Sequence, residues 1–381
     1  MRRLLLSIAF GCVALPAAAG TVGLGAVLTT KDGGQIYGFD INQHGDDGVL
    51  ASAQTIDADG DVLVSMETFD QDTGKITKSF AKYQGPRNSY AVDGIFAGDV
   101  ALVTHFVVPN GSIFAKRLYE TMNPVTARKF TGDWVSPVKD IDVQQVGVNQ
   151  DSSTALLYAI ELKKDDKPIL VVSDIASGTV SNVIHLDPNL ASLSNGAHVA
   201  QFTSANQAIV ALSPDGGAVG GSAPLNMIVD LASGKTQQFS GYNFGQFHAG
   251  YVNGLAVDPN TGVAVTTTEL NSEVEFYDMV KKKGITAVQL PCTDNTDQVN
   301  SGANVAVDPV NKLFLVTDPT YCDGSQGGAL LVYDEAGNLL NTITGFNFAI
   351  SEPAPVLNPS KRMGWAFSGP DGFTELQQFF Y

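Results

Sequence analysis

The sequence predicts an all-β protein, a seven-bladed β-propeller with four-stranded antiparallel blades. Three observations support this fold. A turn followed by a β-branched apolar run recurs about every 50 residues, an acidic residue ends a later strand in most units, and no segment keeps a helical periodicity beyond two turns. Because so small a sheet cannot bury both of its own faces, the units must stack against one another.

The pattern is clearest in residues 248–278. A short apolar run precedes the turn Asp-Pro-Asn-Thr-Gly at 258–262, where Pro fixes one backbone angle and Asn and Gly tolerate positive φ. Residues 263–268 are a β-branched run, and 274–277 alternate apolar and acidic positions. These segments predict three strands of one blade.

The turn recurs with Pro259, Pro309 and Pro359 in register, 50 residues apart. Weaker marks precede apolar runs earlier in the chain, so the marks fall at residues 57, 97, 149, 204, 258, 308 and 358. A second marker, the acidic residue that ends a later strand, recurs at Asp70, Glu120, Asp174, Asp230, Asp278 and Asp334. Seven units of four short strands are typical of a β-propeller.

The two ends of the chain are expected to share a sheet. Strands are predicted at 25–30 and 35–41, before the first mark, whereas the last unit, 353–381, holds about three strands. An N-terminal strand that joins the C-terminal blade would close the ring and remove an exposed sheet edge. The sequence leaves open which of the two strands does so.

The first 19 residues have the pattern of a secretory signal peptide. Arg2 and Arg3 precede an apolar run, and Ala17 to Ala19 form a small-residue cleavage site. A lipoprotein signal at Cys12 fits less well, because the apolar run continues past the cysteine. We expect a signal peptide over 1–19, one propeller domain over 20–381, no membrane span, and a secreted or periplasmic protein.

The chain is acidic, with 22 Lys and Arg against 39 Asp and Glu and a net charge of −17. Such a surface repels nucleic acid and anionic lipid, and solubility is its simplest explanation. The sequon at Asn110 is equally well explained as a turn. Cys292 and Cys322 lie beside turns in adjacent units, where export permits a disulfide, and two free thiols are the alternative.

Residues 253–259 (Asn-Gly-Leu-Ala-Val-Asp-Pro) and 303–309 (Ala-Asn-Val-Ala-Val-Asp-Pro) resemble the inner-strand signature of the YVTN, NHL and gluconolactonase-like propellers. The resemblance covers the fifth and sixth units and is specific for architecture. These families include scaffolds, binders and hydrolases. It implies an exported module that binds a ligand or protein, or alternatively a Ca²⁺-dependent lactonase or related hydrolase with its site at the central channel mouth.

In the gluconolactonase-like hydrolases, Asn, Asp and Glu side chains at the starts of inner strands hold a calcium ion. Only Asn253 falls on that motif position here, because the residues 50 and 100 positions further are Ala303 and Pro353. The resemblance implies a ring of oxygen ligands around one calcium ion. Its candidate members, which do not occupy equivalent positions in their units, are Asp93, Asp142, Asn253, Asn304 and Glu352. Polar caps on the channel mouth are the alternative.

Two histidines, His198 and His248, precede inner strands and are 50 residues apart. They are the candidate general bases or metal ligands, although a hydrogen bond to a neighbouring blade is the simpler role. The acidic turn 57–61 lacks the Gly and the Glu of a calcium loop, because Val62 and Thr68 stand there. No motif of a serine hydrolase, zincin or c-type haem protein occurs.

Overall fold

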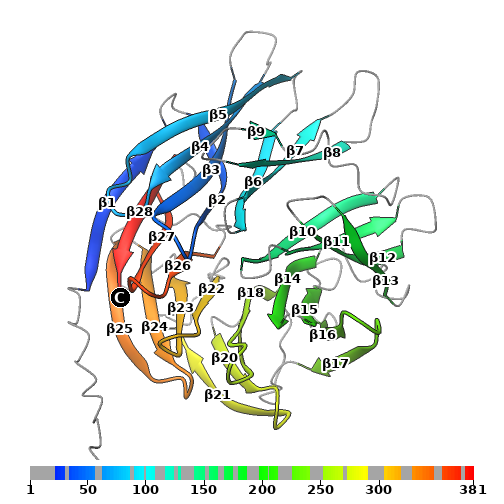
Figure 1. Ribbon diagram of the computed structural model, residues 1–381. Coiled ribbons are helices and arrows are strands. Elements are labelled where there is room, and N and C mark those ends of the chain that lie inside the picture. Colours follow the sequence, from blue (N-terminus) through cyan, green and yellow to red (C-terminus); the bar gives the residue numbers. More distant parts are fainter. Residues whose placement is uncertain are drawn as a thin grey trace, which may run out of the picture.

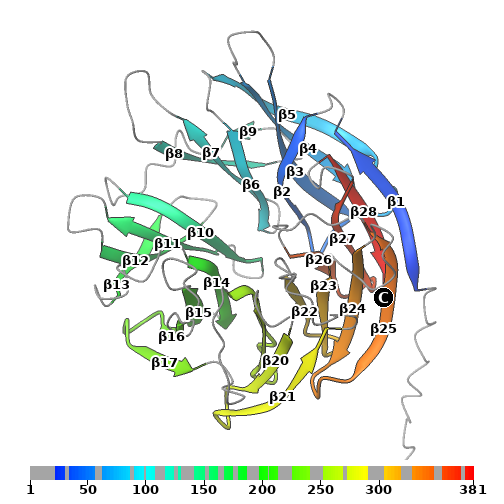
Figure 2. The ribbon, with the colours of Figure 1, turned by 180° about the vertical axis from the view of Figure 1, so that it is seen from behind.

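The computed structural model describes residues 22–30, 34–55, 62–85, 90–97, 100–107, 116–123, 128–129, 141–150, 154–161, 167–174, 179–186, 197–204, 206–212, 225–240, 252–268, 273–290, 304–318, 328–346, 354–369 and 374–381. In this part of the chain, 28 strands form seven four-stranded antiparallel sheets. Figure 1 and, from behind, Figure 2 show them arranged around a central axis. The described residues include no helix that is long and apolar enough to cross a membrane.

Six of the sheets have described cores, and we name them blades A to F. Blade A contains β2 (Gln35–Ile41), β3 (Asp47–Thr55), β4 (Val62–Asp70) and β5 (Ile76–Gly85). Blade B contains β10 (Ile141–Asn149), β11 (Thr154–Glu161), β12 (Lys167–Asp174) and β13 (Val180–His185). Blade C contains β14 (Ala197–Ser204), β15 (Gln207–Leu212), β16 (Leu225–Asp230) and β17 (Thr236–Ser240).

The remaining blades follow the same order. Blade D contains β18 (Val252–Val257), β19 (Val263–Thr268), β20 (Glu273–Asp278) and β21 (Lys283–Gln289). Blade E contains β22 (Val305–Asp308), β23 (Leu313–Asp318), β24 (Gly328–Asp334) and β25 (Leu339–Phe346). Blade F contains β26 (Val356–Asn358), β27 (Met363–Ser368), β28 (Glu375–Phe380) and β1 (Gly23–Thr29).

The expectation of seven blades is corrected by the packing between sheets. Among the described residues, buried hydrophobic clusters join blades F and A, B and C, C and D, D and E, and E and F, which makes six packed blades. The other sheet contains β6 (Tyr90–Ala97), β7 (Val100–Val107), β8 (Lys116–Asn123) and a two-residue β9 (Arg128–Lys129), and it is defined by backbone pairing. The repeat of turns counts every sheet whose strands pair, this one included. The repeat therefore overestimated the number of blades.

The cores are built from aromatic rings that meet between adjacent blades. Phe69 of blade A packs edge-on against Trp365 of blade F, with ring centroids 5.3 Å apart. Phe276 of blade D packs in the same way against Phe314 of blade E, at 6.0 Å. Such edge-to-face pairs stabilise beyond the area that they bury. Each blade thus supplies the hydrophobic cover that its neighbour lacks.

Strand β1 closes the ring, as expected for an N-terminal strand. It pairs antiparallel with β28, from Gly23 opposite Phe380 to Thr29 opposite Glu375. Figure 1 shows the two strands side by side at the left rim. Strand β2, the other candidate, belongs to blade A.

Gln378 joins three segments at this closure. Its side chain is 2 % exposed. Its Oε1 accepts a hydrogen bond from the Ala26 amide in β1 at 2.9 Å, and its Nε2 donates to the Gln71 carbonyl after β4 at 2.7 Å. A single buried amide therefore ties the N-terminal strand, the C-terminal blade and blade A together.

The first mark of the predicted repeat is wrong in its register. Residues 56–61 lie outside the described residues, between the second and third strands of blade A, whereas the later marks lie between first and second strands. The equivalent turn of blade A is at 42–46, where the Asn42 Oδ1 accepts a hydrogen bond from the His44 amide at 2.9 Å. This turn lacks the Pro of blades D to F, and the acidic run 57–61, which is also followed by an apolar run, was taken as the mark in its place.

The register of the three prolines is confirmed. Each follows a side chain that accepts hydrogen bonds from its own turn: Asp258 from the Asn260 amide, Asp308 from the Asn311 amide and Asn358 from the Lys361 amide. Asn260 then donates to the Pro309 carbonyl at 3.2 Å, and Asn311 to the Pro359 carbonyl at 3.3 Å. The same turn therefore occupies the same place in blades D, E and F.

These turns define one face of the ring. Connections between first and second strands, and between third and fourth strands, lie at the same end of each antiparallel sheet. We call this end the turn face. Its described turns cover 42–46, 71–75, 231–235, 258–262, 279–282, 309–312, 335–338 and 359–362.

Replacing Gln378 by Leu is expected to lower the free energy of unfolding by about 1–3 kcal/mol, because the half-buried Ala26 amide loses its partner and the Gln71 carbonyl keeps only the Trp365 Nε1 as a donor. Urea unfolding followed by tryptophan fluorescence measures the change. Gln237→Leu, at an exposed position of β17, is the matched control. Equal stability of the two variants would contradict the role of Gln378 in closing the ring.

Candidate functional site

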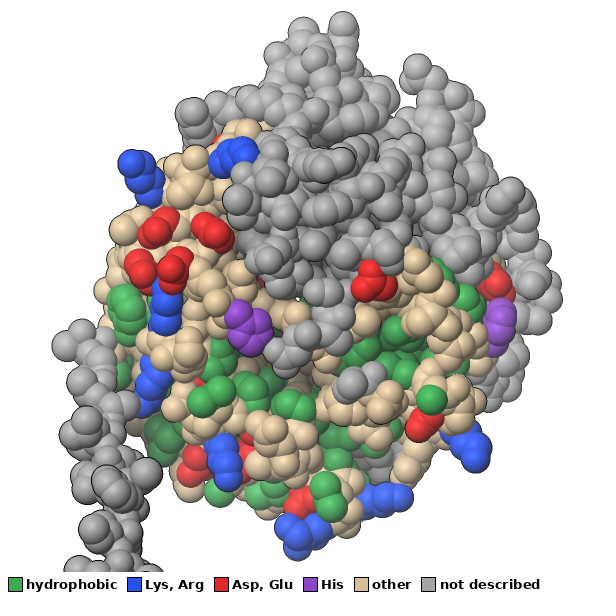
Figure 3. Space-filling model, in the orientation of Figure 1, with side chains coloured by type: hydrophobic (Ala, Val, Ile, Leu, Met, Phe, Trp, Pro, Cys, Tyr) green, Lys and Arg blue, Asp and Glu red, His purple; other side chains and the backbone are tan. Residues whose placement is uncertain are grey.

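The turn face carries a group of acidic side chains over blades A and F and a group of exposed lysines over blades D and E. Over blades A and F, Lys361 lies between two exposed carboxylates, with its Nζ 2.7 Å from Asp46 and 2.8 Å from Asp72. Hydrogen bonds, first from the Thr73 hydroxyl, hold the pKa of Asp70 below its usual range. Figure 3 shows a group of acidic side chains on the left, and several basic side chains with acidic ones among them along the lower edge.

The basic part combines lysines with exposed valines. Val280, between β20 and β21, is 75 % exposed, and Val310, between β22 and β23, is 69 % exposed. Three lysines, at 282, 283 and 312, are exposed beside them, and no ion pair of these lysines occurs among the described residues. We call Val280, Lys282, Lys283, Val310 and Lys312 the basic strip.

The basic strip is continuous across blades D and E. A Cβ built on Gly262 would lie 2.9 Å from the Cγ2 of Val280, which places the turn 258–262 against the turn 279–282. The hydrogen bond from Asn260 to the Pro309 carbonyl places the same turn against 309–312. The two valines are thus separated by one turn and belong to one surface.

Two lysines of the strip occupy backbone positions that suit glycine. Lys282 has φ 54° and Lys312 has φ 56°. Gly74 and Gly234 stand where Lys282 stands in other blades, with φ 67° and 71°, and Gly262 stands where Lys312 stands, with φ 74°. A left-handed conformation costs a residue with a Cβ about 1–2 kcal/mol. Lysine at these two positions is therefore unfavourable for folding, which points to a use for its charge.

Arg362, the third such residue at φ 49°, has a structural role. Its guanidinium lies 5.9 Å from the centre of the Tyr381 ring. The Tyr381 hydroxyl donates a buried hydrogen bond of 2.9 Å to the Asp308 Oδ2. Burial, followed by the nearby Asp308 carboxylate, raises the pKa of Tyr381. This group joins the end of blade F to the turn of blade E.

One buried carboxyl group lies between blades C and D. Glu275 of β20 is 3 % exposed and shares a strand face with Tyr277, which packs on the cluster between these blades. Burial raises the pKa of Glu275 to about 7, the Glu273 carboxylate adds to the rise, and the Thr266 hydrogen bond opposes it. The group titrates near neutral pH but lies in the wall of the ring.

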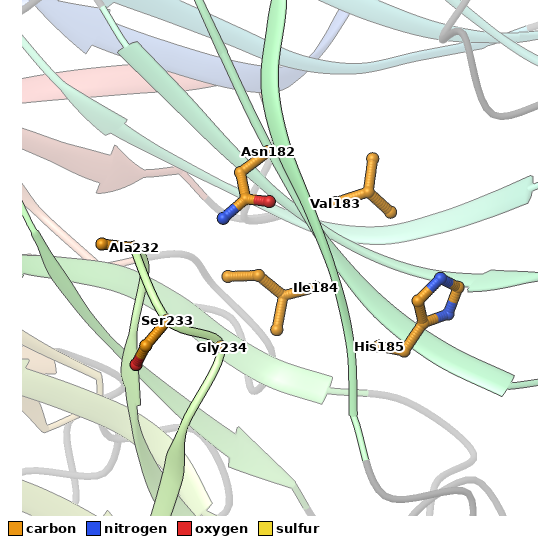
Figure 4. A pocket seen from close by; sticks show the side chains of 7 residues that line it. All are labelled: Asn182, Val183, Ile184, His185, Ala232, Ser233 and Gly234. Carbon is orange, nitrogen blue, oxygen red and sulfur yellow. The ribbon is translucent and has the colours of Figure 1, made fainter.

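A hollow of about 250 Å³ lies between β13 and the turn 231–235 of blade C. The Asn182 Nδ2 donates to the Leu231 carbonyl at 2.6 Å, and Ser233 lies near this contact. Figure 4 shows the His185 ring on the opposite side of β13 from Asn182. His185 instead lies 3.6 Å from the Glu161 Oε2. The hollow therefore does not bring its polar groups to one point.

The structure places part of the predicted calcium ring. Asp93, Asp142 and Asn253 lie in the first strands β6, β10 and β18, and their side chains lie outside the described part. Asn304 precedes β22, and its amide donates to the Thr317 Oγ1 at 2.8 Å. Glu352 lies outside the described residues. The backbone thus places Asp142, Asn253 and Asn304 at the starts of first strands, at the end opposite the turn face, and Asp93 in the middle of β6.

The other predicted site residues are not tested by the structure. The side chain of His198, in β14, and the whole of His248, Cys292, Cys322 and Asn110 lie outside the described residues. Within the described residues, no group of three His, Cys, Asp or Glu side chains is arranged to hold a metal. The calcium site at the channel mouth, the histidine roles and the disulfide remain predictions.

The basic strip was not predicted from the sequence. The run Lys281-Lys282-Lys283 in a chain of net charge −17 was its available signal. The sequence did not distinguish Val280 and Val310 from core valines, because contacts between distant segments decide whether a valine beside a strand is buried.

Comparison with known proteins supports the fold. No family model and no curated protein matches the sequence. Among solved structures, the chain is similar to the crystal structure of the RRP9 WD40 repeats, with a TM-score of 0.62 and 11 % sequence identity over 94 % of this chain and 99 % of that one. The protein has a β-propeller fold similar to that of these repeats.

Glu275→Gln is expected to change how stability depends on pH. Because the folded-state pKa of about 7 lies above the ordinary value of 4.5, the protonated carboxyl stabilises the fold below pH 4.5, and this contribution is lost as pH rises through 7. The variant should therefore gain stability relative to the wild type between pH 5 and pH 8, by up to about 3 kcal/mol. Denaturant unfolding across this range measures the gain, and parallel stability curves would contradict the raised pKa.

Proposed function

We propose that the protein is an exported β-propeller scaffold that binds a partner protein through the basic strip. The fold supports this, since WD40 propellers typically bind proteins. The signal-peptide pattern of residues 1–19 supports export. The observation that carries the proposal is the pairing of two highly exposed valines with three lysines on an acidic protein.

The chemistry of the strip indicates the partner. If a partner covered the exposed surface of Val280 and Val310, each valine would contribute about 1–2 kcal/mol to the free energy of binding. Lys282, Lys283 and Lys312 attract negative charge locally, whereas the net charge of −17 repels nucleic acid and anionic lipid at longer range. The complementary partner is an acidic protein segment that carries apolar side chains.

Hydrogen bonds within the turns keep the basic strip in one conformation before a partner binds. The Asp258 and Asp308 side chains accept amide hydrogen bonds within their turns, and the Asp278 Oδ1 accepts one from the Lys281 amide at 2.7 Å. Little conformational entropy is then lost when a partner binds. A Ca²⁺-dependent lactonase, the alternative raised by the sequence, is favoured by no group among the described residues and stays a prediction.

Reversing the charge of the strip is expected to weaken binding. A displayed library of acidic peptides with apolar residues is selected on the wild-type protein, and the Kd of selected peptides is measured by calorimetry. Lys282→Glu with Lys312→Glu should raise this Kd at least tenfold, because attraction becomes repulsion. Lys235→Glu, on an exposed turn of blade C, should leave it unchanged. The proposal would be contradicted if the selected peptides bound the Lys282→Glu, Lys312→Glu variant as tightly as the Lys235→Glu control.

Replacing the two strained lysines by glycine separates stability from binding. Lys282→Gly with Lys312→Gly is expected to raise the free energy of unfolding by about 1 kcal/mol, because glycine adopts positive φ without strain. The same variant should bind the selected peptides more weakly. Thermal unfolding and calorimetry measure the two effects. A variant that is more stable and binds equally well would show that the lysines do not serve binding.

A further inference from the structure

The carboxylate of Asp258 has a buried oxygen that the described residues do not satisfy. Asp258 is 0 % exposed. Its Oδ1 accepts a hydrogen bond from the Asn260 amide at 2.7 Å, but no hydrogen-bond partner of its Oδ2 is described. A buried carboxylate oxygen without a donor or a cation is strongly unfavourable. A donor or a cation that is not among the described residues would satisfy this oxygen.

The equivalent side chains in the next two blades are fully paired. The Asp308 Oδ2 accepts from the Asn311 Nδ2 at 2.7 Å and from the Tyr381 hydroxyl at 2.9 Å. The Asn358 Nδ2 donates to the Gln71 Oε1 at 3.0 Å. In both cases the partner from the next blade is the first residue after its third strand. This atom of the turn therefore faces that position.

At the Asp258 turn, this position is occupied by an acidic residue. Glu335 is the first residue after β24, the third strand of blade E. The Thr261 hydroxyl, three residues after Asp258, donates to the Glu335 Oε1, so the Glu335 side chain reaches this turn. Where the other junctions pair a hydroxyl or an amide with the turn, this one brings two carboxylates together. No ion pair of either carboxylate occurs among the described residues.

We propose that this junction binds a divalent cation of the calcium class. Asp258 and Glu335 supply two carboxylates, whose charge a divalent ion neutralises, and the Thr261 hydroxyl oxygen is a third ligand. Calcium accepts such oxygen ligands with flexible geometry and completes its shell with water. The half-buried Glu335 provides access from solvent. The site is distinct from the predicted channel-mouth site, because it lies on the turn face, between Val280 and Val310.

Calcium titration of the purified protein tests this proposal. Calorimetry should show binding, and millimolar calcium should raise the midpoint of thermal unfolding by several degrees, because the ion binds the folded state. Glu335→Gln should abolish both effects. Without calcium this variant should melt no lower than the wild type, since an amide at this position can donate to Asp258. Asp308→Asn, at the equivalent paired position, should keep the calcium response.

Two results would overturn the proposal: no calcium response in the wild type, or a response retained in Glu335→Gln, which would place the ion elsewhere. If Glu335→Gln does not fold, Asp258→Asn with Glu335→Gln reproduces the Asn358 and Gln71 pair, and it should fold without responding to calcium. The test is independent of the basic strip, because it uses neither a peptide nor a lysine variant.

Discussion

Every blade depends on its neighbours for burial, so the ring holds together only if it closes. The closure is made by pairing β1 with β28, which covers the last blade and brings the two ends of the chain into one sheet. Gln378 reinforces it from inside, because its amide reaches both β1 and the residue after β4. Trp365 and Phe69 then pack across the same junction. Opening this junction would expose two hydrophobic faces at once.

A closed ring keeps the turns at fixed positions, so residues that differ between blades D and E come together on one surface, for which we propose a binding role. The backbone of the turn at 309–312 matches that at 258–262, yet Lys312 replaces Gly262 at the left-handed position. The first residue after the third strand also differs: Gln71 and Tyr381 pair with the Asn358 and Asp308 side chains, whereas Glu335 accepts a hydrogen bond from the Thr261 hydroxyl. The shared turn supplies the geometry, and both proposals rest on the residues that depart from it.

The sequence predicted much of the architecture because turns carry strong local signals. The Asp-Pro and Asn-Pro turns located blades D, E and F, and the strand-poor last unit predicted closure by the N-terminal strand. The blade A turn at 42–46 has no Pro, and the acidic run 57–61 gives a competing turn signal, so the first mark was misplaced. Packing between sheets decides which sheets are packed blades, and exposure decides whether Val280 is core or surface. Both arise from contacts between distant segments, which a local pattern does not contain.

The claim that the ends of the chain form one sheet is tested most directly by hydrogen exchange of the amides in β1 and β28. If the account is right, the amides of Gly23–Thr29 that pair with β28 are protected, and they lose protection together with those of Glu375–Phe380 as denaturant is added. Rapid exchange throughout Gly23–Thr29 while Glu375–Phe380 remains protected would show that β1 does not close the ring.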